Sequence, residues 1–234
     1  MSLQAYAVAL RIGIVDNGLT FPDAVQMNRQ ITNTINFTTA KVVQWMWLGE
    51  ITGTHNIPGH PCILIANHES YLDFLLIGYS LVKIACVPFR FWAKPKVTHH
   101  YLWKKYSEIF SAIEVGKESS VSELMDISGK ALEQGNYICI FPEGTRSRTG
   151  ELLPFKQGYL KLASTFGLEI VPIYLEHTFD AWPPQKRLPH KKKCNVTFYP
   201  PIQIAKDTKR PDIERLNREI MGKYLKYRCG EICG

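Results

Sequence analysis

Short apolar runs alternate with stretches of helical periodicity along most of this 234-residue chain. The apolar runs are rich in β-branched and aromatic residues, and they predict strands over residues 62–66, 84–91, 137–141, 169–175 and 195–204. The periodic stretches between them predict helices over residues 71–81, 100–110, 120–134, 155–166 and 211–227. This alternation indicates an α/β fold in which helices flank a mostly parallel sheet.

The N-terminal part of the chain shows the pattern of one long amphipathic helix over residues 20–48. A capping threonine and an early proline open it, and Gly49 marks its end. Apolar residues recur along one side, at Ala24, Met27, Ile31, Ile35, Val42 and Met46. We therefore divide the chain into an N-terminal amphipathic helical segment, residues 1–50, and an α/β domain, residues 51–234.

The motif NHESYLD, residues 67–73, follows the strand predicted over 62–66. Inside one helix, His68 and Asp73 would lie about 140° apart and could not cooperate. If Ser70 instead caps the next helix, Asp73 takes the third helical position and points back toward His68. The carboxylate can then hold one imidazole nitrogen and leave the other free to accept a proton, as in a general base. The alternative is a capping box beside an ordinary loop histidine.

A second polar motif, FPEGTRS at residues 141–147, comes directly after a predicted strand. Such a turn exposes backbone N–H groups, and Arg146 adds a planar, permanently charged donor suited to phosphate. Glu143 could orient Arg146 or bond a substrate hydroxyl. We interpret the motif as an anion site, the alternative being a polar turn with solvated side chains.

Two lysines could extend this anion site. Lys156 follows the motif closely, and Gly158 permits close approach of a ligand in the first turn of the next helix. Lys117 stands at the end of a short β-like segment, residues 113–117. Either lysine could instead be simply solvated.

Composition and charge narrow the class of protein. Hydrophobic residues make up 45% of the chain and charged residues 21%, which excludes disordered and fibrous proteins. Lysine and arginine total 28 against 21 acids, so the formal net charge of +7 favours anionic partners. The aromatic residues do not interleave with a basic stripe, and we therefore expect no nucleic-acid partner.

The patterns of cysteine and of hydrophobic residues argue against metal sites, membrane spans and signal peptides. Six cysteines are present and three lie in apolar runs, which predicts reduced, structural thiols. Histidines and acids do not cluster at metal-ligand spacing, so no metal is expected. No uncharged apolar stretch reaches about 18 residues, and the first residues lack a basic leader, so neither a membrane span nor a signal peptide is expected.

Together the two motifs resemble the glycerolipid acyltransferase family, most closely its 1-acylglycerol-3-phosphate acyltransferase branch. NHESYLD matches the family signature of histidine, four residues and aspartate, FPEGTRS matches its phosphate motif, and IVPI at 170–173 matches its fourth motif. The resemblance covers residues 42–205. It departs at Gly116-Lys117, where the family usually has arginine. Lysine keeps the positive charge of arginine but lacks its bidentate hydrogen-bonding fork.

This resemblance implies the glycerolphosphate acyltransferase-like fold and a transfer reaction. An acyl chain would pass from acyl-coenzyme A or acyl carrier protein to the free hydroxyl of 1-acylglycerol-3-phosphate, giving phosphatidate. His68 would be the base and Asp73 would orient it, without a covalent acyl-enzyme. No cofactor is implied. The substrate-binding residues would be Lys117, Glu143, Gly144, Thr145, Arg146 and Lys156.

The implied substrates reside in a bilayer, which makes the membrane a partner. Phe37, Trp45 and Trp47 near the end of the N-terminal helix suit monotopic docking, so we expect peripheral or monotopic association at the cytoplasmic face. Basic residues would assist on an anionic surface if they share a face, at positions 94, 96, 104, 105, 186, 187 and 191–193. The alternative is that this helix only packs on the domain.

Two further interpretations stay open. The catalytic pair could serve another acceptor, such as a different lysophospholipid, glycerol-3-phosphate or a lysolipid with an amino-acid head group. A non-catalytic lipid-binding module of the same fold is the other.

Overall fold

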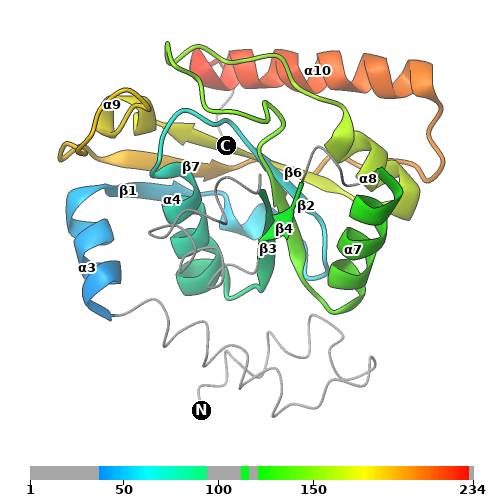
Figure 1. Ribbon diagram of the computed structural model, residues 1–234, viewed down its shortest axis with the longest axis horizontal. Coiled ribbons are helices and arrows are strands. Elements are labelled where there is room, and N and C mark those ends of the chain that lie inside the picture. Colours follow the sequence, from blue (N-terminus) through cyan, green and yellow to red (C-terminus); the bar gives the residue numbers. More distant parts are fainter. Residues whose placement is uncertain (1–36, 94–111, 116–120, 232–234) are drawn as a thin grey trace.

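The computed structural model describes residues 37–93, 112–115 and 121–231, which build one seven-stranded sheet (Figure 1). The strand order is β1-β7-β6-β2-β5-β3-β4. Every pairing in it is parallel except that of β6 with β7, which confirms the mostly parallel sheet. The strands are β1 (Leu48–Thr52), β2 (Ile63–Ala66), β3 (Phe89–Ala93), β4 (Ile113–Glu114), β5 (Tyr137–Ile140), β6 (Ile170–Glu176) and β7 (Cys194–Phe198).

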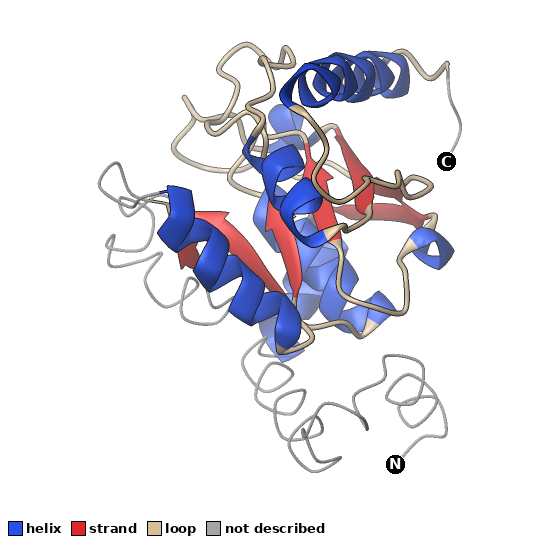
Figure 2. Cartoon of the chain, turned by 90° about the vertical axis from the view of Figure 1, so that its right-hand side faces the viewer, coloured by secondary structure: helices blue, strands red, loops and turns tan. Residues whose placement is uncertain are grey.

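Helices cover both faces of this sheet (Figure 2). One face packs against α3 (Phe37–Met46), α4 (Asp73–Tyr79) and the π-helical turn η2 (Ser80–Ala85) that continues α4. The other face packs against α7 (Val121–Glu133), α8 (Gly158–Phe166) and α10 (Arg210–Arg228). The 3-10 turn η1 (Thr54–Asn56) follows β1, and the short helix α9 (Thr178–Ala181) follows β6. None of the helices in the described ranges is both long and apolar enough to cross a bilayer.

The central strands are apolar on both faces because both faces are covered. In β2, Leu64 and Ala66 belong to the core on the α4 side, whereas Ile63 and Ile65 belong to the core on the α8 and α10 side. All four side chains are fully buried. This two-sided burial explains why the strand reads as a continuous apolar run rather than as an alternating one.

Most predicted elements are confirmed with shifts of a few residues at their ends. The strands over 62–66, 137–141 and 169–175 match β2, β5 and β6, and the helices over 120–134, 155–166 and 211–227 match α7, α8 and α10. The last predicted strand, 195–204, ends early, at Phe198. The predicted helix over 100–110 lies outside the described residues.

The predicted strand over 84–91 is wrong in its first half. Residues 80–85 continue α4 as a π-helical turn, which ends at Cys86 in the left-handed conformation with φ of 55°. The extended chain of β3 begins only at Phe89. A short apolar run has the same pattern in a buried helix and in a buried strand, so periodicity could not separate the two.

The described part of the predicted N-terminal helix ends at Met46, two residues earlier than expected. Residues 48–52 instead form β1, which pairs in parallel with β7 and spans both sides of the predicted boundary at residue 50. Val43 and Trp47 are buried in the core, so this end of the segment packs on the domain. The remainder, residues 20–36, lies outside the described residues, and the division into two parts stays a prediction.

Side chains complete the backbone pairing at the carboxyl end of β2. The Ile173 N–H donates to the Tyr224 hydroxyl (3.2 Å), which in turn donates to the Ile65 carbonyl (2.6 Å). One residue beyond β2, the Asn67 amide accepts from the Leu175 N–H (2.8 Å) and donates to the Leu175 carbonyl (3.0 Å). Both inserted side chains are fully buried, so they fix the path of the loop that follows β2.

The prediction of buried, structural thiols in the apolar runs is confirmed for Cys62 and Cys139 and is wrong for Cys86, which is exposed. Cys62, Cys139 and Cys194 are free thiols buried in or beside strands. Burial raises the pKa of all three, that of Cys194 to about 12, which makes them unreactive.

Candidate active site

The two sequence motifs meet at one edge of the sheet. NHESYLD follows β2 and FPEGTRS follows β5, and these strands are parallel neighbours. The carboxyl ends of parallel neighbours lie side by side, and ligands of such sheets bind at this edge. The topology therefore brings together segments that are more than seventy residues apart, as the 75-residue separation of His68 and Glu143 shows.

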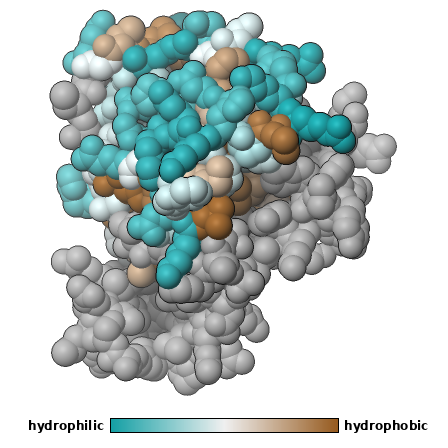
Figure 3. Space-filling model, turned by 90° about the vertical axis from the view of Figure 1, so that its left-hand side faces the viewer, coloured by the Kyte–Doolittle hydropathy of each residue, from teal (hydrophilic) through white to brown (hydrophobic). Residues whose placement is uncertain are grey.

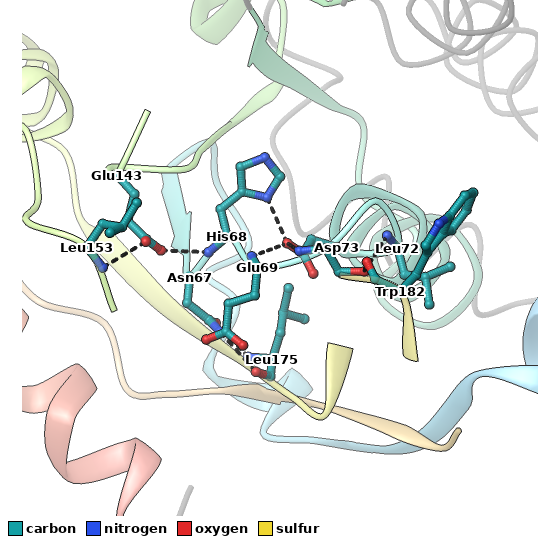
Figure 4. A network of polar contacts seen from close by, with 10 residues as sticks. Asn67, His68, Glu69, Leu72, Asp73, Glu143, Leu153, Leu175 and Trp182 are labelled. Atoms are coloured by element: carbon teal, nitrogen blue, oxygen red, sulfur yellow. Dashed lines mark hydrogen bonds and ion pairs between the residues drawn. The ribbon is translucent and has the colours of Figure 1, made fainter. Parts of the chain in front are cut away.

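His68 and Asp73 form a hydrogen-bonded pair (Figure 4). The Nδ1 atom of His68 lies 2.7 Å from Oδ2 of Asp73, whose side chain is fully buried. The same carboxylate oxygen also accepts the N–H groups of Glu69 (2.7 Å) and Ser70 (2.8 Å). Because this oxygen acts as an acceptor, Nδ1 carries the proton and Nε2 is left as the acceptor of the ring. Nε2 has no partner within the described part of the chain.

The start of α4 differs from the expectation. The helix begins at Asp73 with Leu72 before it, so the prediction that Ser70 caps the helix and that Asp73 takes the third position is wrong. The Ser70 hydroxyl instead accepts from the Leu72 N–H (3.1 Å) and donates to the Trp182 carbonyl (2.7 Å). Asp73 still faces His68 because its carboxylate binds the N–H groups of the turn itself.

Aromatic stacking fixes the imidazole plane. The His68 ring lies on Phe141, with centroids 4.0 Å apart and planes 16° apart, and Phe141 lies in turn on Phe91. The His68 side chain is 19% exposed, so part of it stays accessible while one face of the ring is restrained by Phe141. Nothing in the spacing of the motifs had pointed to Phe141, although it is the first residue of FPEGTRS.

Glu143 joins the second motif to the histidine. Its Oε1 accepts the His68 N–H (2.7 Å) and its Oε2 accepts the Leu153 N–H (2.9 Å), as Figure 4 shows. The Ser147 N–H donates to the His68 carbonyl (2.8 Å), so the same turn holds the histidine backbone on both sides. Both oxygens of Glu143 thus serve the protein backbone, and its predicted contact with a substrate stays a prediction.

Burial dominates the electrostatics of Glu143. With 3% of the residue exposed, burial raises the pKa of its carboxyl to about 8, against the opposing effect of the N–H donors from Leu153 and His68.

The cationic residues predicted for phosphate lie around the same turn. Gly144 has φ of +68°, and a Cβ placed on it would come within 2.8 Å of the Lys156 Nζ, so the lysine ammonium lies against this glycine. Thr145 beside it is exposed. The guanidinium carbon of Arg146 lies 3.7 Å from the centroid of the Tyr71 ring. Lys117 lies outside the described residues.

Glu69 is a buried acid of the site that sequence analysis missed. It accepts a hydrogen bond from the Asn67 amide (3.2 Å), and burial, assisted by nearby Asp73, raises the pKa of its carboxyl to about 7. Tyr71 and Trp182 were missed as well. Only the position of Glu69 and Tyr71 within NHESYLD could have drawn attention to them, and Trp182 lies in none of the motifs.

The family model described as Acyltransferase matches residues 49–176. The 1-acyl-sn-glycerol-3-phosphate acyltransferase alpha of Bos taurus is 29% identical over 161 residues, 65% of this chain and 53% of that protein. The 1-acyl-sn-glycerol-3-phosphate acyltransferase of Borreliella burgdorferi is 33% identical over 142 residues, 57% of this chain and 54% of that protein. The chain thus spans about half the length of these curated relatives.

A solved structure shows the same fold. The crystal structure of the 1-acyl-sn-glycerophosphate (LPA) acyltransferase PlsC from Thermotoga maritima superposes with a TM-score of 0.70 and covers 99% of this chain and 96% of its own. The two sequences are 18% identical. The family match extends from within β1 to the end of β6, more than half of the chain, and it contains both motifs. The protein therefore belongs to the acyltransferase family.

Proposed function

We propose that this protein transfers a fatty acyl group from acyl-coenzyme A or acyl carrier protein to the free hydroxyl of 1-acylglycerol-3-phosphate, giving phosphatidate. The observation that supports it most is the direct junction of the two motifs at His68. The backbone of the histidine is hydrogen-bonded to Glu143 and Ser147 of the phosphate motif, so the proposed base lies beside the proposed phosphate-binding turn. The relatives from Bos taurus and Borreliella burgdorferi are named 1-acyl-sn-glycerol-3-phosphate acyltransferases, which supports this acceptor.

The geometry suggests the order of proton transfers. Nε2 of His68 takes the proton of the acceptor hydroxyl as its oxygen attacks the thioester carbonyl, and Asp73 stabilises the imidazolium that forms. Collapse of the tetrahedral intermediate breaks the carbon–sulfur bond, and the imidazolium returns the proton to the leaving thiolate. The acyl group thus moves directly to the acceptor, and no acyl-enzyme forms.

The acceptor's phosphate would be held by the turn after β5. Arg146 and Lys156 supply positive charge there, and Gly144 lets the backbone approach closely. Thr145 is exposed and can donate its hydroxyl, and we propose that Lys117 assists. The same site would also accept another phosphorylated lysolipid, which is the second candidate function.

We further propose peripheral association with an anionic membrane surface from the cytoplasmic side. On α3, Trp45 is 64% exposed and Val42 is 46% exposed, and the Lys191 ammonium lies 3.9 Å from the Trp45 ring centroid. The Lys193 ammonium donates to the carbonyls of Gln44 and Leu48, so basic and apolar residues share this side of the molecule, which Figure 3 views. Such a mixture suits the interface of a bilayer with anionic lipids.

A thiol-release assay tests the reaction. With long-chain acyl-coenzyme A and 1-acylglycerol-3-phosphate in detergent, we expect release that requires the acceptor and falls by at least about a hundredfold in His68→Ala, the scale of a lost general base. The matched control is His60→Ala, an exposed histidine before β2 whose imidazole lies 3.8 Å from the Glu169 carboxylate. Release without acceptor would indicate a thioesterase, and full activity in His68→Ala would exclude this mechanism.

A further inference from the structure

Arg146 rests on an aromatic platform that no motif had indicated. Its guanidinium carbon lies 3.7 Å from the Tyr71 ring centroid, and the Tyr71 ring contacts Trp182 with centroids 5.0 Å apart. Tyr71 is one of the four residues between His68 and Asp73. The platform therefore connects the phosphate motif to the loop between His68 and Asp73 by a fourth contact, besides the stacking of Phe141 on His68 and the hydrogen bonds of Glu143 and Ser147 to His68.

The stacking leaves the hydrogen-bonding capacity of the arginine unused. A ring under a guanidinium covers one of its faces, whereas all five N–H donors lie in its plane and stay accessible. No described residue accepts a hydrogen bond from the Arg146 side chain or forms an ion pair with it. The cation is thus held by an uncharged partner that does not compete with an incoming phosphate.

The platform itself is anchored to the catalytic loop. The Ser70 hydroxyl donates to the Trp182 carbonyl (2.7 Å), and the Trp182 indole N–H donates to the Lys186 carbonyl (3.1 Å). Beside Arg146, the Ser147 N–H is bonded to the His68 carbonyl (2.8 Å). The arginine is therefore fixed relative to the histidine through both its side chain and its neighbouring backbone.

We propose that Tyr71, supported by Trp182, is a positioning residue that presents the in-plane donors of Arg146 to the phosphate of the acceptor. This inference rests on the proposed function, because it takes the phosphate-bearing acceptor as given. Its consequence is that Tyr71 sets the preference for phosphorylated over unphosphorylated acceptors without taking part in proton transfer.

Steady-state kinetics in detergent test this role. We expect Tyr71→Leu to raise KM for 1-acylglycerol-3-phosphate about 3- to 30-fold, the range of a partly desolvated cation–π contact, with kcat within about twofold. With monoacylglycerol, which lacks the phosphate, kcat/KM should equal that of the wild type. Tyr71→Phe keeps the ring and should restore KM to within about twofold of the wild-type value.

A double-mutant cycle separates positioning from a general structural role. In the Arg146→Ala background, Tyr71→Leu should change KM no further, because the cation it positions is gone. Phe166→Leu, an aromatic-to-leucine change on α8 where the ring packs near Gly129, is the matched control and should leave KM unchanged.

Equilibrium binding of 1-acylglycerol-3-phosphate to the same variants makes the result independent of turnover. The positioning role is overturned if Tyr71→Leu leaves both KM and binding unchanged, or if it weakens them equally with and without Arg146. The proposed function alone would be overturned if the wild type bound the acceptor without acylating it and the variants still showed coupling between Tyr71 and Arg146 in binding. A wild type that neither binds nor acylates the acceptor would overturn both.

Discussion

At the scale of single residues, the site rests on buried carboxylates whose partners are N–H groups rather than cations. Asp73 receives the turn N–H groups of Glu69 and Ser70 together with the His68 ring, and Glu143 receives two more backbone N–H groups. These bonds orient the carboxylates, but those of Glu143 do not cancel the cost of removing its charge from water, because burial still raises its pKa. The site is therefore well ordered and electrostatically strained at neutral pH.

Glu69 allows this strain to be measured. The pKa of its carboxyl is about 7 in the folded protein against an ordinary 4.5, so the folded state binds the proton more tightly than the unfolded chain does. The contribution of Glu69 to the stability of the folded state is therefore greatest below pH 4.5, and it falls as pH rises toward 7. Glu69→Gln keeps an oxygen for the Asn67 amide and removes the titration. We expect the variant to be more stable than the wild type at about pH 8, by about 1–3 kcal/mol.

Urea unfolding of both proteins at about pH 5 and about pH 8 measures this difference. The wild type should lose stability between the two values, and Glu69→Gln should lose less, with Glu143 accounting for part of the remaining slope because its pKa is also raised. The exposed α7 glutamate provides a control, Glu133→Gln, with the wild-type slope. Equal slopes in Glu69→Gln and the wild type would show that Glu69 ionises in the folded protein without cost.

At the scale of elements, two glycines differ in whether their surroundings can accept a side chain. Gly53, just after β1, has φ of +69°, and a Cβ there would lie 1.9 Å from the Phe198 carbonyl oxygen at the end of β7. Gly222 lies within α10 with nothing near its missing Cβ. We expect Gly53→Ala to lower the free energy of unfolding by at least about 2 kcal/mol, and Gly222→Ala to raise it by about 0.5–1 kcal/mol.

Chemical denaturation of the two alanine variants and of the wild type checks these predictions. Because both variants carry the same glycine-to-alanine change, their effects can be compared directly. Destabilisation by Gly222→Ala would mean that α10 does not keep its helical form there. A neutral Gly53→Ala would mean that the edge formed by β1 and β7 can shift to admit a methyl group.

How well a helix or strand could be predicted from the sequence depends on whether its hydrophobic pattern fits only one type of element. The strands β2 and β5 could be predicted because a strand buried on both faces requires a continuous run of apolar residues. The π-helical turn over 80–85 could not, since its apolar residues suit either a strand or a helix. The strand β1 was hidden because LGEIT is short and contains Gly49, which indicated only a helix end, and it is its pairing with β7 that reveals the strand.

The candidate site was predictable in part for a similar reason. The spacing of His68 and Asp73 within one loop brought them together by local geometry, and motif order placed Arg146 after a strand. The contacts of Glu143 with the His68 backbone and of Tyr71 with Arg146 depend on which strands are neighbours in the sheet. That information is long-range, and no local pattern contains it.

At the scale of the whole molecule, the side that carries α3 and the loop over 186–193 should decide membrane association. We expect the full chain to float with anionic liposomes at low salt and to stay at the bottom with zwitterionic ones or at high salt, because screening weakens contacts to lipid head groups. Reversing four basic loop residues should abolish flotation, namely Lys186→Glu, Arg187→Glu, Lys191→Glu and Lys192→Glu.

The matched control reverses four exposed basic residues on the side of α10, with Lys209→Glu, Arg218→Glu, Lys223→Glu and Lys226→Glu. It changes the net charge equally and should leave flotation intact. Equal loss in both variants would show that net charge, and not this surface, governs binding, and wild-type protein left at the bottom with anionic vesicles at low salt would refute the docking proposal.

The hydroxyl of Tyr224, inserted between β2 and β6, also has a consequence for the order in which the site can form during synthesis. Tyr224 reaches back across 159 residues to the Ile65 carbonyl, three residues before His68. A nascent chain is made in one direction, and pairings between distant segments must wait for the later partner to emerge. The loop that carries His68 is therefore translated early and receives its final support late, so an incomplete chain on the ribosome would carry the histidine but not the framework that fixes its position.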